Sequence, residues 1–145
     1  MRVLITGVNG FVGTNLYNHL STQNHLFGVD ISVDEKKHHC KTYNWNDPGE
    51  LEKTFKLMFK TNFGLNALML DFPNIEDCDT EEWDAIVNKF IKSSKIKKNG
   101  VIISSLSDTL PKYLRERCFK SGIVPLQGMS ESLIAISNSI KIAKA

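Results

Sequence analysis

The fold is decided near the N-terminus, where residues 3–13 read VLITGVNGFVG. The apolar run over residues 3–5 is typical of a buried parallel strand, and residues 11–20 have the spacing of a helix. The turn between them is rich in glycine. A strand, a glycine-rich turn and a helix in this order predict the start of an α/β fold, with an anion site at the N-terminus of the helix.

Each glycine of the turn has a predicted role. Gly7 permits the tight turn, Gly10 lets a pyrophosphate approach the backbone, and Gly13 allows the helix to pack closely on the strand. Asp30 ends the second apolar run and is placed to accept hydrogen bonds from an adenosine ribose, which favours NAD over NADP. The candidate cofactor-binding residues are Gly7, Asn9, Gly10, Phe11, Gly13 and Asp30. The alternative is that the glycines only allow the turn and that Asp30 only closes a strand.

Strand and helix patterns alternate along the chain. We expect strands over residues 3–5, 25–30, 40–45, 66–70, 101–104 and 123–126. We expect helices over residues 11–20, 47–59, 79–91, 111–121 and from 130 onward. Strands that alternate with helices predict a parallel sheet covered on both faces. The predicted fold class is therefore α/β, a three-layer, doubly wound parallel sheet of about six strands in a single domain, residues 1–145.

Local patterns also predict helix ends and inner faces. Asp47 followed by Pro48 is typical of a helix start. Pro125 has no N–H for a strand ladder, so it places its strand at a sheet edge. In the last helix we expect Leu133 to face inward. The expected apolar side of the first helix consists of Phe11, Val12, Leu16 and Leu20.

Composition and charge exclude several classes of protein. Of the 145 residues, 41% are hydrophobic and 23% charged, which is typical of a folded globular domain and excludes a disordered chain. A net charge of +2 indicates no attraction to nucleic acid or to a membrane surface, and no apolar run is long enough to span a bilayer. Three cysteines without a CxxC motif predict free thiols, a cytoplasmic location and no metal site. The expected partner is a dinucleotide at most, and the oligomeric state stays open.

The N-terminal part of the chain resembles a known family. Residues 6–13, TGVNGFVG, with Asp30 after the second strand, look like the start of extended short-chain dehydrogenase/reductases, the NAD-dependent epimerase/dehydratase group, over about residues 1–60. The resemblance implies a Rossmann-like fold and NAD as cofactor. In that family the catalytic groups are a Ser or Thr and a Tyr-x-x-x-Lys pair. Here Tyr113 is followed four residues later by Arg117, and arginine holds its proton too firmly to replace the lysine.

Two further departures from that family concern its active site. Ser104 and Ser105 end a predicted strand where the family has its catalytic Ser, but a strand end rich in hydroxyl groups is common. Residues 71–73, DFP, stand where the family has small residues that pass under the cofactor, and Asp71 would repel a pyrophosphate. We therefore predict no catalytic residue and, at most, weak binding of NAD.

From about residue 63 the chain resembles a second family. This family is the CoA-ligase subdomain of NDP-forming acyl-CoA synthetases, a flavodoxin-like module. The resemblance rests on the order and spacing of residues 67–73, ALMLDFP, residues 101–106, VIISSL, and residues 121–128, SGIVPLQG. It implies a phosphorylated His, an ATP-grasp module and a separate CoA-binding domain, none of which we identify in this sequence.

The two resemblances together predict a hybrid, with residues 1–60 reductase-like and residues 63–145 CoA-ligase-like. We interpret the chain as a hybrid scaffold, engineered as a chimera, with no complete active site and at most residual NAD binding. A natural fusion and an unfamiliar divergent family are the alternative origins. The alternative functions are an NAD-dependent oxidoreductase or epimerase of the extended short-chain type and a non-catalytic interaction module of an acyl-CoA synthetase. The missing Tyr-x-x-x-Lys pair argues against an enzyme and leaves that question open.

Overall fold

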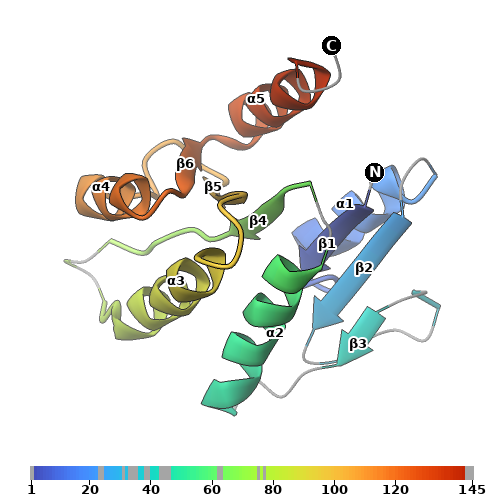
Figure 1. Ribbon diagram of the computed structural model, residues 1–145, viewed down its shortest axis with the longest axis horizontal. Coiled ribbons are helices and arrows are strands. Elements are labelled where there is room, and N and C mark those ends of the chain that lie inside the picture. The colour runs from blue at the N-terminus through green and yellow to red at the C-terminus, as the bar shows by residue number, and fades with distance from the viewer. Residues whose placement is uncertain are drawn as a thin grey trace. The chain divides into compact units, whose positions relative to one another are not determined.

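The computed structural model describes residues 2–22, 25–30, 32, 36–37, 40–42, 47–61, 64–74, 76 and 78–142. Its strands are β1 (Arg2–Thr6), β2 (His25–Asp30), β3 (Cys40–Thr42), β4 (Asn66–Met69), β5 (Gly100–Ser104) and β6 (Val124–Gln127). Its helices are α1 (Phe11–Leu20), α2 (Pro48–Lys60), α3 (Glu81–Ser94), α4 (Lys112–Lys120) and α5 (Met129–Ile142) (Figure 1). Strands alternate with helices except between β2 and β3, so the predicted α/β class is confirmed.

The chain forms two compact units. Unit 1 comprises residues 1–66 and 92–99, and unit 2 comprises residues 67–91 and 100–145. This division differs from the predicted halves, residues 1–60 and 63–145, because a later segment of the chain returns to unit 1. The predicted halves are defined by resemblance to two families, which the division into units does not test. The two halves and the single domain therefore stay predictions.

Unit 1 is built on a parallel sheet in the order β1-β2-β3. The register pairs Arg2 with His25 and Thr6 with Val29, so β1 and β2 end together. The chain must cross from the end of β1 to the start of β2, and α1 makes this crossing. The core of this part of unit 1 consists of the buried residues Ile5, Val8 and Leu26, against which Leu16, Tyr17, Leu20 and Cys40 pack.

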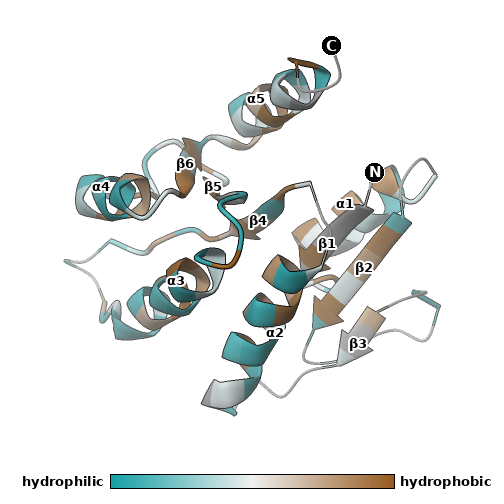
Figure 2. Cartoon of the chain, in the orientation of Figure 1, coloured by the Kyte–Doolittle hydropathy of each residue, from teal (hydrophilic) through white to brown (hydrophobic). Residues whose placement is uncertain are grey.

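Helix α2 begins as the sequence predicts. The Asp47 carboxylate accepts a hydrogen bond from the Gly49 N–H at 2.8 Å, and Pro48 occupies the first turn, where its missing N–H costs no hydrogen bond. The helix has hydrophilic and hydrophobic residues on different sides (Figure 2). Its buried apolar residues are Phe55, Met58 and Phe59.

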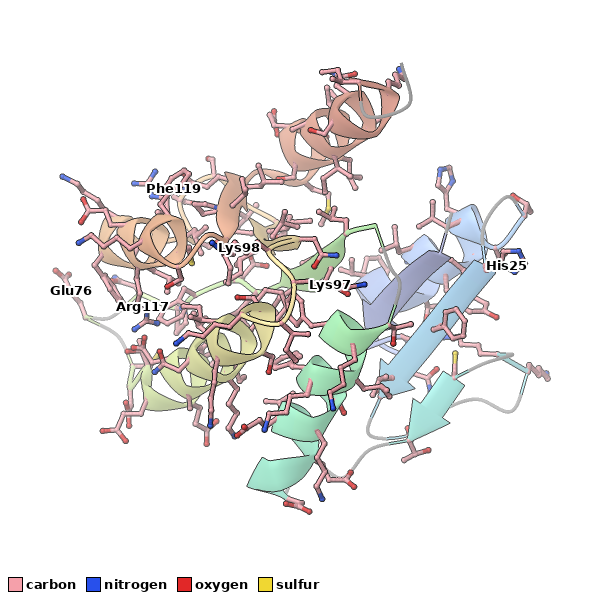
Figure 3. All side chains as sticks on the ribbon, in the orientation of Figure 1. His25, Glu76, Lys97, Lys98, Arg117 and Phe119 are labelled. Carbon is pink, nitrogen blue, oxygen red and sulfur yellow. The ribbon has the colours of Figure 1, made fainter. Side chains whose placement is uncertain are left out.

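Residues 92–99 complete unit 1. The Asn66 N–H donates to the Asn99 carbonyl at 2.9 Å, and the two side-chain amides are hydrogen bonded at 3.0 Å. Lys92 forms an ion pair with Glu52 of α2 at 3.1 Å. Lys97, labelled in Figure 3, donates to the Thr61 carbonyl just beyond α2. The C-terminal end of α3 and the turn after it are therefore part of the same unit as α2.

Unit 2 has a second parallel sheet, in the order β4-β5-β6. Strand β5 is buried along its whole length and pairs with β6 from Val101 opposite Val124 to Ser104 opposite Gln127. Strand β6, which contains Pro125, lies at the edge of this sheet, as predicted. Helix α4 contributes the fully buried Leu114 and Cys118 to the core of the unit.

The predictions of which side of α1 and of α5 faces inward are wrong in part. Phe11 and Val12, at the start of α1, are 87% and 40% exposed, whereas Leu16 and Leu20 pack on the core as expected. In α5, Leu133 is 45% exposed and its neighbour Ser132 is buried. The Ser132 hydroxyl donates to the Gly128 carbonyl at 2.6 Å, so its burial leaves no unpaired donor. In the part of the chain that the structure describes, no helix is long and apolar enough to cross a membrane.

The three cysteines differ in exposure, and we expect them to differ in reactivity. Cys78 is exposed, Cys40 is half-buried and Cys118 is fully buried. Burial raises the pKa of Cys40, and it raises the pKa of Cys118 to about 11, so neither thiol is ionised to a useful extent at neutral pH. With Ellman's reagent at pH 7, we expect Cys78 to react first and Cys118 only on unfolding. Loss of the fast phase in Cys118→Ser, and not in Cys78→Ser, would contradict this order.

Candidate functional site

The glycine loop, residues 7–10, joins the end of β1 to the start of α1. Gly7 has a φ of +68°, a conformation that residues with a side chain rarely adopt. Its N–H donates to the Val29 carbonyl of β2 at 2.8 Å. The Gly10 N–H donates back to the Gly7 carbonyl at 3.0 Å, which closes the turn. The tight turn predicted at Gly7 is therefore present, and it is fixed to the neighbouring strand.

Gly10 is the N-cap of α1, and it provides no side-chain acceptor for the first turn. The first N–H groups of a helix have no partner within the helix, and the helix dipole makes this end positive. The first turn of α1 contains no acidic residue that would neutralise it. The sequence thus leaves an uncapped, positively polarised helix end directly after the glycine loop. Such an end suits a phosphate group.

Gly13 lies where α1 passes closest to the glycine loop. A Cβ atom at this position would be 2.0 Å from the Gly7 carbonyl oxygen and 2.8 Å from the Val8 Cα. Both are backbone atoms, which cannot rotate away as a side chain can. The structure therefore requires glycine at residue 13 for helix packing, as the sequence analysis predicts.

Asp30 and Asn9 are in direct contact. The Asn9 N–H donates to Oδ2 of Asp30 at 2.6 Å, and Asp30 is only 9% exposed. Asp30 ends β2, which lies beside β1, so the sheet brings this carboxylate to the glycine loop. The sequence analysis predicts that Asp30 accepts hydrogen bonds from a ribose. The structure adds a second role, because Asp30 also holds the loop through its hydrogen bond with Asn9.

Phe11, the remaining predicted residue, opens α1 with its side chain 87% exposed. The structure thus brings the glycines, Asn9 and Asp30 together, while the Phe11 side chain extends into solvent beside them. Sequence reasoning missed two residues that also reach the loop, Ser32 and Lys37. Both lie in a polar stretch after β2 that has no periodic pattern, so no sequence signal indicated that they return to the loop.

The end of β5 in unit 2 was the second place considered for chemistry. The Ser104 hydroxyl donates to the Leu106 carbonyl at 2.8 Å, and Ser104 is fully buried. The Ser105 hydroxyl donates to Asp71 at 2.6 Å, and Thr109 donates to the same carboxylate at 2.7 Å. Both serine hydroxyls therefore take part in hydrogen bonds that shape the loop after β5.

Asp71 is expected to make this loop sensitive to acid. Partial desolvation raises the pKa of Asp71, but hydrogen bonds from Ser105, Thr109 and the Leu106 backbone outweigh it, and the net pKa is lowered. A lowered pKa in the folded state means that the stabilisation is present above the usual aspartate pKa and is lost as the pH falls through the folded value. We expect Asp71→Asn to lower the free energy of unfolding at pH 7 by about 1 kcal/mol, since Asp71 is exposed, and to flatten the loss of stability below about pH 4. Denaturant titrations at several pH values measure both effects, with Asp108→Asn as a control because Asp108 is an exposed acid of the same loop. An unchanged acid profile in Asp71→Asn would contradict this prediction.

Tyr113 and Arg117 are the remaining candidates for a catalytic pair. Arg117, labelled in Figure 3, forms an ion pair with Asp84 at 2.6 Å. Burial, together with the Asp84 carboxylate, raises the pKa of Tyr113. A tyrosine that acts as a base at neutral pH needs a lowered pKa. The surroundings of Tyr113 therefore act against such a role. Among the residues that the structure describes, no three His, Cys, Asp or Glu side chains gather as metal ligands.

Comparison with solved structures shows a Rossmann-like α/β fold. No protein-family model and no curated protein matches the sequence. A nucleoside-diphosphate-sugar epimerase from Staphylococcus aureus matches with a TM-score of 0.55 and 17% identity, over 86% of this chain and 48% of that one. A triphenylmethane reductase from Citrobacter sp. matches with a TM-score of 0.53 and 14% identity, over 87% of this chain and 47% of that one. The chain thus spans less than half the length of either protein, and at these identities the likeness concerns the fold alone.

Proposed function

We propose that unit 1 is a dinucleotide-binding module that takes NAD at the glycine loop. The observation that carries the proposal is the uncapped N-terminus of α1, which follows Gly10 without an acidic residue in its first turn. A helix end of this kind attracts the pyrophosphate, and a strand–glycine loop–helix unit is the usual place for it in a Rossmann-like fold.

The residues present fit such a ligand. The N–H groups of Phe11, Val12 and Gly13 belong to the first turn and are the donors we assign to the pyrophosphate. Gly10 keeps the approach to them free of a side chain. Asp30, at the end of β2, is assigned to the adenosine ribose, and its negative charge favours NAD over the 2′-phosphate of NADP. When bound, NAD would supply hydride-transfer chemistry, while the protein supplies binding and orientation.

We propose binding without a complete active site as the function of this chain. Both serine hydroxyls at the end of β5 are engaged in the loop, and the pKa of Tyr113 is raised, so we assign no catalytic residue. A hybrid origin, reductase-like in residues 1–60 and CoA-ligase-like in residues 63–145, remains our proposal for how such a scaffold arose.

A second candidate function is an NAD-dependent oxidoreductase or epimerase. It is favoured by one observation: the two solved structures above are described as an epimerase and a reductase, and each covers more than four fifths of this chain. Turnover in this case would need groups that we have not assigned within residues 1–145. A test for turnover is therefore secondary to a test for binding.

Calorimetric titration of the purified chain with NAD, NADP and CoA tests the proposal. We expect NAD to bind with a Kd below about 100 μM, equivalent to about −5.5 kcal/mol, and NADP to bind more weakly. Binding of CoA alone would favour the interaction module of an acyl-CoA synthetase. No heat with any of the three ligands, from protein that unfolds cooperatively, would overturn the proposed function.

A further inference from the structure

Lys37 makes hydrogen bonds to the glycine loop and to α1 at the same time. Its ammonium group donates to the carbonyl oxygen of Val8, to Oδ1 of Asn9 at 2.9 Å and to Oγ1 of Thr14 at 3.0 Å. An ammonium has three N–H donors, and here each has an oxygen acceptor. The same group lies 5.7 Å from the centre of the Tyr17 ring, one turn further along α1. Lys37 therefore joins the loop to the second turn of the helix.

Asn9 is held in the same way by the end of β2 and by the segment that follows it. Its backbone N–H donates to Asp30 at 2.6 Å, and its side-chain amide donates to the Ser32 carbonyl at 2.6 Å. Its side-chain oxygen accepts from Lys37. Three of the four polar groups of this one loop residue are thus bound by residues that are 21 to 28 positions away in the sequence.

A glycine-rich loop needs such a restraint if it is to bind tightly. Glycine has more backbone freedom than any other residue, so a loop with Gly7 and Gly10 has many alternative conformations. When only a fraction of the protein has the binding conformation, the apparent affinity falls by that fraction. A side chain that fixes the loop from outside removes this loss.

We propose that Lys37 is the positioning residue of the glycine loop, and that its three hydrogen bonds hold the loop in the conformation that binds the dinucleotide pyrophosphate. The proposal rests on the proposed function, because it concerns the same site. Lys37 acts through Val8, Asn9 and Thr14, and its donors are already used by these residues. It therefore shapes the site without being a ligand of the phosphate itself.

Two measurements on Lys37→Met test the proposal. In the protein without ligand, we expect the amide hydrogens of residues 8–12 to exchange at least about 10-fold faster than in the parent chain, while the other amides of unit 1 keep their rates. In calorimetry, we expect the Kd for NAD to rise by about 10-fold or more. Lys37→Arg keeps a charged donor group of similar length and should restore both values to within about 3-fold. Lys53→Met removes the same charge at an exposed residue of α2, in the same unit, and should change neither.

The two readouts separate this inference from the proposed function. If the parent chain does not bind NAD, the proposed function fails, and the exchange measurement still tests whether Lys37 restrains the loop. Unchanged exchange in Lys37→Met overturns the proposal, even if NAD binds more weakly, because the lysine would then act on the ligand itself. Equal or tighter NAD binding by Lys37→Met also overturns it, because the lysine would then compete with the ligand for the loop.

Discussion

Replacing Gly13 with alanine is expected to destabilise unit 1 strongly and to abolish NAD binding. The new methyl group would lie 2.0 Å from the Gly7 carbonyl oxygen, so α1 and the glycine loop could not keep their present distance. Overpacking of a well-packed region usually costs about 1–3 kcal/mol, and contacts with rigid backbone belong at the upper end of that range or above it. We expect the free energy of unfolding to fall by about 3 kcal/mol or more. Chemical denaturation followed by circular dichroism measures this change.

Gly64→Ala is the matched control for Gly13→Ala. It adds the same methyl group in the same unit, at a position where a Cβ would meet no atom within 4 Å and where φ is not positive. We expect a change in the free energy of unfolding within about 0.5 kcal/mol. If the two variants were equally stable and both bound NAD, this would contradict the prediction that α1 packs too closely on the glycine loop to accept a side chain at residue 13.

Replacing Gly10 with aspartate is expected to weaken NAD binding strongly without lowering the stability of the protein. Gly10 has φ −66° and ψ 167°, an extended conformation that suits an N-cap residue with a side chain. A carboxylate here would accept hydrogen bonds from the first turn of α1 and complement the helix dipole, so we expect an unchanged or slightly higher free energy of unfolding, by up to about 1 kcal/mol. The same carboxylate would occupy the place assigned to the pyrophosphate and repel it. We expect the Kd for NAD to rise at least about 100-fold, equivalent to about 2.7 kcal/mol.

Gly10→Asn separates the charge from the shape of the new side chain. Asparagine caps a helix about as well as aspartate but carries no charge, so we expect it to weaken NAD binding less than aspartate does. The added Cβ would be 3.2 Å from the Gly7 carbonyl oxygen in both variants, so this contact cancels in the comparison. NAD binding that survives in Gly10→Asp would place the nucleotide elsewhere on the protein.

Elements with strong local signals were predictable from the sequence. Helix α1 and strand β2 have the predicted bounds, and the Asp47 cap is present. The signals for them are the glycines before α1, the acid at the end of β2 and the proline in the first turn of α2. Each of these signals acts on only a few neighbouring residues, so it can be recognised in the sequence. The inner faces were harder to predict. Hydropathy places Phe11 on the apolar side of α1, but its side chain is 87% exposed and is not among those that pack on the core of Ile5, Val8 and Leu26. In α5 the Ser132 hydroxyl donates to the Gly128 carbonyl, which permits Ser132 to be buried and which hydropathy alone does not indicate.

The candidate site was predictable only in its backbone. The spacing of Gly7, Gly10 and Gly13 indicates where the chain must turn and where the helix must pack closely. Glycine marks these positions because a side chain disfavours such a turn and such close packing. The partners of Asn9 were not all predictable. Asp30 is a β2 residue that the sequence indicates, but Ser32 and Lys37 come from the segment after β2. There, a lysine among other polar residues has no period and no partner of fixed spacing. Such contacts join residues far apart in the sequence, and no local pattern indicates them.

The return of residues 92–99 to unit 1 has a consequence for how the chain is made. A ribosome releases the protein from the N-terminus, and compact parts begin to fold as they emerge. Residues 67–91, which belong to unit 2, leave the ribosome before Lys92, Lys97 and Asn99 can meet Glu52, Thr61 and Asn66. Unit 1 therefore cannot be completed until the chain has been synthesised past residue 99. A fragment that stops at residue 66 would lack all the contacts that Lys92, Lys97 and Asn99 make, although Glu52 would keep its ion pair with Lys56. Because each unit consists of two separate stretches of the chain, neither can be obtained whole by a single cut.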